Sequence, residues 1–506
     1  MGMKIKPSKC RSLSISSGTS SIIHFHVGPD NIPSIAEDDQ KFLGCLLFFK
    51  GKSKEVFEYV RKTIITKCEN IDSALVRPEY KIQIYKKYLL PSIRFLLTVH
   101  DVTATHLKAL DTATDKFLKV WAGVPRSATN AVFHHSKCLN IQAISHLYQE
   151  THTLNYASSR FKGDELVNHA LDCRVERESK WTRKGSTAVR SHEAFQLALS
   201  FHVVPEAVED PPISAFPHVK EQIKLDLTMA CDRKWQDHIS KLVVQGKFLE
   251  LATAARNDVT WNSYIYNLPS GTMKFIINAS LDTLATKANL KRWGKSPSDK
   301  CPHCGYRETT NHILNCCKVY LDQGRYTWRH NNIMNDIAQC TDNSKFDIFS
   351  DIPGYTTSSG GSIPPNILVT TQKPDIVFII KKTQKISIFE LTVPFEPRIS
   401  ESHRLKTEKY SVLEADINNA GFQATITSFE IGSRGFIDTE NKKTLKSIYE
   451  FTKKEITVKK FIDNISSLAT SSSYYIFTCR KEPDFRDTPY LRPILYSQTT
   501  IIIVIN

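Results

Sequence analysis

The stretch KPDIVFII at residues 373–380, followed by ISIFELTV at residues 386–393, decides how the carboxy-terminal part of this chain is expected to fold. Short apolar runs rich in β-branched residues are typical of buried strands, and the polar residues between them predict a turn. The two runs should therefore pair as a β-hairpin that brings Asp375 beside Glu390. Two carboxylates a few ångströms apart repel each other unless a cation lies between them, so this geometry predicts a Mg²⁺ site.

A polar helix is predicted after the hairpin, over residues 400–420. Leu405, Leu413 and Ile417 are expected to face the core, and Lys406 and Lys409 lie on one flank of the helix. A lysine near a metal-bound phosphate can stabilise developing charge or orient the attacking water. The spacing does not decide whether Lys406 or Lys409 reaches the two acids. An ordinary strand pair with surface acids and a solvated lysine helix is the alternative interpretation.

Pro-Asp375, a spacer of fourteen residues and then Glu390 resembles the PD-(D/E)XK nuclease motif. More narrowly, KPD…ELTVPFE…KTEKY resembles the restriction-like endonuclease of R2-type non-LTR retrotransposons. In the broad superfamily a lysine lies two residues after the second acid, where this chain has Thr392. The R2 group typically supplies the lysine from the following helix instead, which Lys406 and Lys409 match. The resemblance implies that Asp375 and Glu390 bind catalytic Mg²⁺ and that Lys406 or Lys409 completes the catalytic set.

Two further residues of this region have expected roles. Glu396 is expected either to assist the metal site through water or to hold the end of the strand. Arg434 follows another predicted strand, which begins near Thr427, and is a weaker candidate for a phosphate contact.

A cysteine-rich stretch, CPHCGYRETTNHILNCC at residues 301–317, offers ligands for Zn²⁺. Cys301 and Cys304 form a Cys-x2-Cys knuckle, and His312 with a following cysteine completes a tetrahedral set. Cys316 lies one helical turn from His312 and is one candidate for the fourth ligand. R2-type proteins have the spacing C-x2-C-x7-H-x4-C, which Cys317 matches instead. The resemblance thus implies a structural Zn²⁺ ion held by Cys301, Cys304, His312 and Cys317.

Length and charge restrict the possible partners. The 506 residues are enough for roughly three domains of about 150 residues each. A net charge of +15 indicates a polyanionic partner, most simply nucleic acid, with an anionic membrane surface as the rival. No apolar run is long enough to span a bilayer. Of twelve cysteines, four gather between Cys301 and Cys317, which fits a reducing compartment with a metal site.

The amino-terminal third contains sequence stretches that resemble a different domain. YKIQIYKKYLLPSIRFLL at residues 80–97 and LDTATDKFLKVWAGVPRSATNAVFHH at residues 110–135 resemble the thumb of R2-type reverse transcriptases, with Pro91 expected to kink or break its helix. KFLG at residues 41–44 resembles the element that closes the palm. Polymerase chemistry needs paired aspartates after an aromatic residue, and Asp38-Asp39 lack that aromatic. Polymerase activity is therefore not expected, and the chain is expected to be the carboxy-terminal part of a retrotransposon polyprotein.

The sequence predicts a mixed fold with helical amino-terminal and middle regions, a small zinc knuckle and an α/β restriction-endonuclease-like domain. The expected segments are a flexible amino terminus (1–40), a thumb-like helical region (41–125), a helical linker region (126–295), a CCHC zinc knuckle (296–345), a flexible linker (346–370), the endonuclease (371–480) and a tail (481–506). The resemblance implies a nuclear, Mg²⁺-dependent endonuclease that nicks target DNA to prime reverse transcription, with the DNA target and element RNA as partners and no membrane. The alternatives are an inactive nucleic-acid-binding remnant and a fragment of a reverse transcriptase.

Overall fold

The structure is a computed structural model of the 506-residue chain, and it describes residues 6–16, 19–35, 37, 40–42, 45–47, 53–181, 187–201, 216–254 and 260–485. The chain divides into two compact units. The first comprises Met1–Val76, Lys81–Leu118 and Gln142–Cys231, and the second comprises Arg77–Tyr80, Lys119–Ile141 and Asp232–Asn506. In the described part of the chain, no helix combines the length and the apolar character that crossing a lipid bilayer requires.

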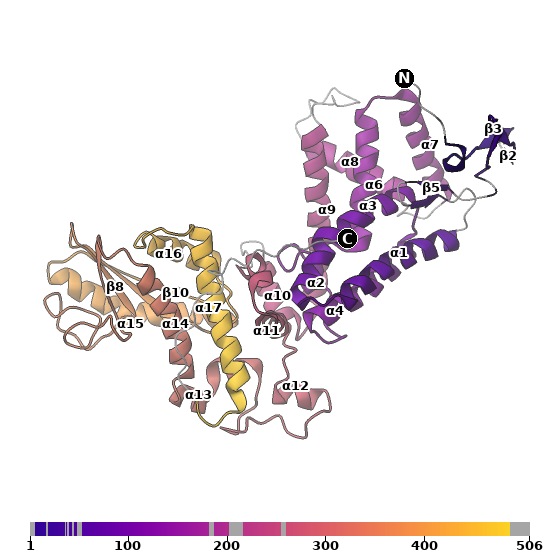
Figure 1. Ribbon diagram of the computed structural model, residues 1–506. Coiled ribbons are helices and arrows are strands. Elements are labelled where there is room, and N and C mark those ends of the chain that lie inside the picture. Colours follow the sequence, from indigo (N-terminus) through magenta and orange to yellow (C-terminus); the bar gives the residue numbers. More distant parts are fainter. Residues whose placement is uncertain are drawn as a thin grey trace. The chain divides into compact units, whose positions relative to one another are not determined.

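The first unit is mainly helical (Figure 1). Three small antiparallel strand pairs come first: β1 (Ser14–Ser16) with β2 (Thr19–Ser21), β3 (Phe25–Val27) with β4 (Asp30–Ile32), and β5 (Gln40–Phe42) with β6 (Cys45–Leu47). The helices that follow are α1 (Ser53–Ser73), α2 (Pro78–Ile84), α3 (Leu90–Val99), α4 (Ala104–Ala122), α6 (Ile144–Phe161), α7 (Glu165–Trp181), α8 (Thr187–Phe201) and α9 (Phe216–Ile239), of which α2, α4 and α9 also extend into the second unit. Leu154, Phe161, Phe195 and Ile223 join α6, α8 and α9 in one buried apolar cluster.

Pro91 does not end its helix. Helix α2 continues through a π-helical turn, Tyr85–Leu89, directly into α3. The Leu90 N–H donates to the Tyr85 carbonyl oxygen, which is a five-residue step. Proline has no N–H and would crowd the preceding turn of a regular α-helix, whereas a π turn is wider. A local widening of the helix therefore replaces the break that was one of the two expected effects of Pro91.

The second unit holds a four-stranded sheet between helices. Its helices are α5 (Ala131–His134), α10 (Gly246–Thr253), α11 (Ser270–Ser280), α12 (Lys287–Arg292), α13 (Lys318–Asp322), α14 (Arg325–Cys340), α15 (Ile399–Asn419), α16 (Thr439–Tyr449) and α17 (Val458–Thr478). Its strands are β7 (Phe346–Ser350), β8 (Ile376–Ile380), β9 (Ile386–Thr392) and β10 (Ala424–Glu430), in the spatial order β10-β9-β8-β7. Strands β7, β8 and β9 pair antiparallel, and α15 connects β9 to its parallel neighbour β10. The predicted hairpin, helix and further strand are confirmed.

The sheet is buried on both faces, because side chains of a strand alternate between the two sides. On one face, Phe378, Phe389 and Leu391 pack in a cluster with residues of α14, α16 and α17. On the other face, Val377, Ile386 and Ile388 pack with Tyr410, Leu413 and Ile417 of α15. Figure 1 shows these helices around β8 and β10. Ile417 is buried as predicted, but Leu405 is 50% exposed, since it lies beside the buried stripe of α15 rather than on it.

Strands also occur inside two segments that were expected to be flexible. Strands β1 to β4 fall within residues 1–40, and β7 falls within residues 346–370. Strand β7 pairs along β8, from Phe346 opposite Ile380 to Ser350 opposite Ile376, and so covers an edge that β8 would otherwise expose. Asp38, Asp39, Gly44 and residues 486–506 lie outside the described residues, as do the features expected there.

Candidate functional site

The two predicted acids meet at the open end of the hairpin. Asp375 directly precedes β8, and the register pairs Ile376 with Phe389, the residue before Glu390. The Asp375 N–H donates to Oε2 of Glu390 at 2.9 Å, and the Leu391 N–H donates to Oδ2 of Asp375 at 2.7 Å. Each carboxylate therefore accepts a hydrogen bond from the main chain of the opposite strand. This reciprocal bonding holds the two side chains side by side.

Helix α15 brings one of its two candidate lysines to these acids. Lys406 Nζ donates to Oε1 of Glu390, which is only 1% exposed. Lys409 Nζ instead donates to the Tyr410 hydroxyl at 2.9 Å and lies 4.5 Å from the centre of that ring. The structure thus places Lys406, and not Lys409, at the acid pair.

A histidine that the sequence did not single out also contacts the acid pair. His330 lies on α14, and its Nε2 is 3.1 Å from Oδ2 of Asp375. Its other ring nitrogen, Nδ1, lies 3.1 Å from Oδ1 of Asn331. No local pattern connects His330 to Asp375, because a long stretch containing β7 separates them in the chain. Only the packing of α14 against the sheet brings them together.

Crowding shifts the pKa values of the two acids in opposite directions. Burial favours a neutral Asp375, but the charges of His330 and Lys406 and the Leu391 N–H outweigh it, so its pKa lies below the ordinary value. Burial and the nearby charge of Asp375 raise the pKa of Glu390, and Lys406 offsets only part of that rise. One carboxylate is thus held ionised while the ionised form of the other is disfavoured. Such a pair gains from an added cation.

Glu396 and Arg434 do not belong to this site. Arg434 Nη2 lies 2.6 Å from Oε2 of Glu396, and the Arg434 N–H donates to Oε1 of Glu396 at 2.6 Å. The guanidinium is sandwiched between the rings of Phe248 and Phe395, 4.3 Å and 4.2 Å from their centres. Both members of the pair are buried. Glu396 therefore holds the chain just beyond β9, the second of its expected roles, and Arg434 is not available to a phosphate.

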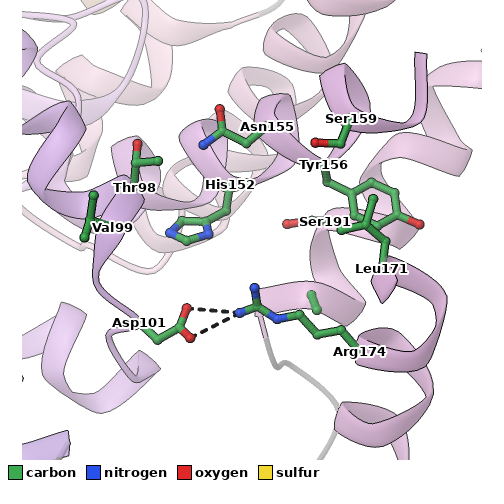
Figure 2. A pocket seen from close by; sticks show the side chains of 11 residues that line it. Thr98, Val99, Asp101, His152, Asn155, Tyr156, Ser159, Leu171, Arg174 and Ser191 are labelled. Atoms are coloured by element: carbon green, nitrogen blue, oxygen red, sulfur yellow. Dashed lines mark hydrogen bonds and ion pairs between the residues drawn. The ribbon is translucent and has the colours of Figure 1, made fainter. Parts of the chain in front are cut away.

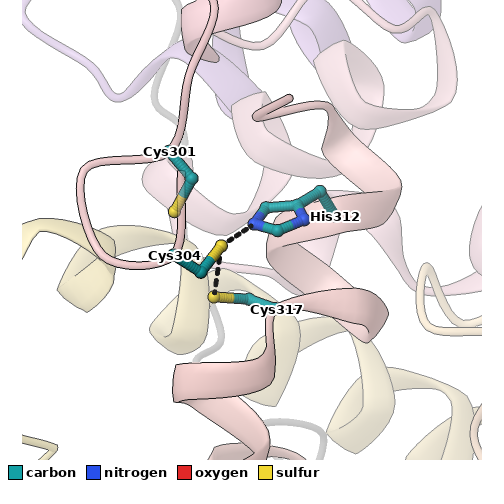
Figure 3. A group of neighbouring side chains, drawn as sticks. All are labelled: Cys301, Cys304, His312 and Cys317. Carbon is teal, nitrogen blue, oxygen red and sulfur yellow. Dashed lines mark hydrogen bonds between the residues drawn. The ribbon is translucent and has the colours of Figure 1, made fainter. Parts of the chain in front are cut away.

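A second cluster is formed by the cysteine-rich stretch. Ligand atoms of Cys301, Cys304, His312 and Cys317 all lie within 4.8 Å of one another, and Figure 3 shows them pointing to one centre. The Sγ atoms of Cys304 and Cys317 are 3.8 Å apart, and Cys304 Sγ is 3.2 Å from His312 Nε2. A tetrahedron with Zn–S bonds of about 2.3 Å has S···S edges of about 3.8 Å. The cluster could therefore hold a zinc-like ion.

A π-helical turn selects the fourth ligand of this cluster. Residues His312–Cys316 form the π turn, and Cys317 follows it directly. In a regular α-helix Cys316, four residues after His312, would lie on the same face as that histidine. The hydrogen bonds of a π turn join residues five apart, so Cys317 lies on that face instead. Cys317 is buried, whereas Cys316 is exposed and contacts Asn311. Burial also raises the pKa of the Cys317 thiol to about 12, so its thiolate needs a cation beside it.

The knuckle is fastened to the strand that carries Glu390. Asn315 Nδ2 donates to the Val393 carbonyl oxygen at 2.8 Å. Arg329 of α14 donates to the Leu314 carbonyl oxygen at 2.9 Å and to the Val393 carbonyl oxygen at 3.1 Å. Val393 directly follows β9. The zinc-like site and the acid pair are therefore parts of one hydrogen-bonded assembly within the second unit.

The first unit contains a polar cavity of about 240 Å³ (Figure 2). Arg174 closes one side of it by an ion pair with Asp101, with N···O distances of 3.0 and 3.2 Å. His152 Nε2 lies 2.8 Å from the Leu97 carbonyl oxygen, and burial lowers the pKa of its ring, which favours the neutral form. Because Asp101 and Arg174 neutralise each other, the lining does not favour a ligand of either charge.

No protein-family model matches the chain, and no curated protein matches it.

Proposed function

We propose that the chain is a Mg²⁺-dependent DNA endonuclease of a non-LTR retrotransposon. It would hydrolyse one phosphodiester bond of duplex DNA and leave a 3′-hydroxyl that primes reverse transcription. One observation carries this proposal: Asp375, Glu390 and Lys406 meet at the open end of the hairpin. Two carboxylates with a lysine are the groups needed to bind a hard cation and to stabilise charge on a phosphate.

The donor chemistry of the acid pair suits Mg²⁺. Asp375 accepts its hydrogen bonds through Oδ2, which leaves Oδ1 without a partner among the described residues. Mg²⁺ prefers carboxylate oxygens and, when bound, would polarise the phosphate and lower the pKa of a water nucleophile. Asp375 and Glu390 would hold the ion. Lys406, released from Glu390 once a cation neutralises that carboxylate, would donate to a phosphate oxygen.

Other features support a restriction-like nuclease domain and a nucleic-acid partner. The hairpin that bears the two acids is followed by helix α15, which bears the lysine, as the resemblance implies, and then by the further strand β10. The net charge of +15 favours DNA and element RNA as partners, through phosphate contacts that do not depend on sequence. A nuclear location belongs to the same proposal.

A plasmid assay tests the proposal. The full chain with Mg²⁺ should convert supercoiled plasmid to the nicked form, and Asp375→Asn should abolish that conversion. Lys406→Ala should slow nicking by about 100-fold or more, whereas the matched control Lys409→Ala should leave the rate nearly unchanged. Equal nicking by the unaltered protein and Asp375→Asn would refute the assignment. DNA binding with no Mg²⁺-dependent cleavage would select the inactive nucleic-acid-binding remnant instead.

A further inference from the structure

A patch of oxygen-bearing side chains lies beside the acid pair on the sheet face that α15 covers. The register places Glu390 opposite Ser428 and Thr392 opposite Glu430 on the parallel strands β9 and β10. These four residues are here called the oxygen patch. Every second residue of a strand lies on the same face, so the patch continues the rows that begin with the apolar residues Ile386 and Ile388 on β9 and Ala424 on β10. Neighbouring strands lie about 4.8 Å apart, so the four side chains adjoin one another.

Three polar atoms of the oxygen patch are buried without a hydrogen-bond partner among the described residues. They are Oγ1 of Thr392, Oγ of Ser428 and Oε1 of Glu430. Glu430 is 1% exposed and Ser428 is 5% exposed, so bulk water does not satisfy them. Buried polar groups in folded proteins almost always have partners, because an unpaired one costs free energy. Three such atoms on one small patch therefore indicate a shared ligand.

The chemistry of the patch specifies that ligand. A carboxylate oxygen can only accept, and the two hydroxyls present lone pairs as well, so the patch suits a cation. All the donors are oxygens, which hard divalent cations such as Mg²⁺ and Mn²⁺ prefer. His403 Nδ1 lies 3.1 Å from Oε2 of Glu430 and so fixes the carboxylate from outside, as groups around a metal ligand commonly do.

We propose that Thr392, Ser428 and Glu430 form a second divalent-cation site, separate from the Asp375–Glu390 pair. None of its three ligands is needed for the proposed Mg²⁺ site, and Asp375 is not part of it. The second site can therefore exist whether or not the chain cuts DNA. Thr392 occupies the place where the broad nuclease superfamily has its lysine, so a cation here would supply positive charge near that position.

Mn²⁺ binding to the zinc-loaded full chain, followed by electron paramagnetic resonance, tests this site without DNA. Glu430→Gln should bind one Mn²⁺ fewer than the unaltered protein, or bind one Mn²⁺ at least 10-fold more weakly. Asp375→Asn should keep the Mn²⁺ that Glu430→Gln loses. Because Glu430→Gln also alters the contact with His403, the double variant Thr392→Val/Ser428→Ala provides an independent test that leaves that contact in place, and it should show the same loss.

Two results would overturn the proposal. In the first, Glu430→Gln and Thr392→Val/Ser428→Ala both bind the same number of Mn²⁺ ions as the unaltered protein, with the same affinity. This would mean that the patch holds ordered water only. The other is a loss of Mn²⁺ that appears in Asp375→Asn alone. Failure of the nuclease proposal is distinguishable, because it would show as absent nicking while the Mn²⁺ dependent on Glu430 is retained.

Discussion

Replacing Lys406 by methionine removes the cation from Glu390 and keeps much of the side-chain volume. Glu390 would then be a buried carboxylate beside a second carboxylate, Asp375, with no lysine to offset either charge. Removing one partner of a fully buried pair costs about 3–5 kcal/mol. Lys406 is 28% exposed, so water can replace part of its contribution, and the expected cost falls to about 1–3 kcal/mol.

Amide hydrogen exchange, followed by mass spectrometry, measures this loss of stability locally, at strand β9. In Mg²⁺-free buffer that leaves the zinc-like site loaded, peptides covering 386–393 should exchange roughly 5- to 150-fold faster in Lys406→Met, which corresponds to about 1–3 kcal/mol. A local readout is needed because the chain has two compact units, and a single unfolding transition cannot be assumed.

Lys409→Met is the matched control on the same helix. Lys409 is exposed, its Nζ donates to the hydroxyl of the buried Tyr410, and it touches neither acid. Its loss should therefore change the free energy of opening by less than about 0.5 kcal/mol. Lys406→Met/Glu390→Gln removes the unpaired charge and should restore most of the protection. Equal exchange in the two methionine variants would refute the assignment of Lys406 to the acid pair.

Two further predictions concern Asp336, which lies on α14, and the cysteine cluster. Burial raises the pKa of Asp336 from 3.8 to about 6, so ionisation of this carboxyl group opposes folding. The resulting destabilisation grows as the pH rises from about 4 to about 6, and it is fully present above pH 6. Asp336→Asn should therefore stabilise α14 against opening by on the order of 3 kcal/mol at pH 8 and by almost nothing at pH 3.5. Amide exchange of peptides covering α14, corrected for its intrinsic dependence on pH, measures this, and a difference between the two proteins that does not depend on pH would contradict it. Cys317→Ser should lose bound zinc, whereas Cys316→Ser should retain it; metal analysis of the two purified proteins checks the assignment, and zinc loss in Cys316→Ser alone would reverse it.

The elements of the sheet were predictable because each is specified locally. The run predicted from residue 376 to 380 is strand β8, and the run predicted from 386 to 393 is β9 without its last residue. Both are short, apolar and β-branched with a polar turn between them, so their pattern alone distinguishes them from helices. The helix expected over 400–420 is observed as Ile399–Asn419 for the same reason. Asp375 beside Glu390 then follows from pairing.

Choices that depended on a turn of the helix or on distant packing were not predictable. Lys406 and Lys409 share a flank of α15, so their spacing does not distinguish them. Only the way in which α15 packs on the sheet determines that Lys406 contacts Glu390 and that Lys409 contacts Tyr410. Residue spacing alone also left Cys316 and Cys317 open as the fourth ligand of the cysteine cluster. The resemblance to R2-type proteins indicated Cys317, which does join the cluster, and the π turn is the physical reason. His330 reaches Asp375 through the packing of α14, which periodicity cannot reveal.

The position of the polar groups shows why burial and charge coincide here. On β9, Ile386 and Ile388 are followed on the same face by Glu390, and α15 shows the opposite order, with Lys406 before its apolar residues Tyr410 and Leu413. The apolar halves of strand and helix therefore pack together, and their polar halves necessarily meet beyond them. Buried carboxylates reduce stability relative to apolar side chains of similar volume, which would have continued the same core. Buried acids with shifted pKa values are common at functional sites, so their position at the end of this sheet supports the proposal that they bind a cation.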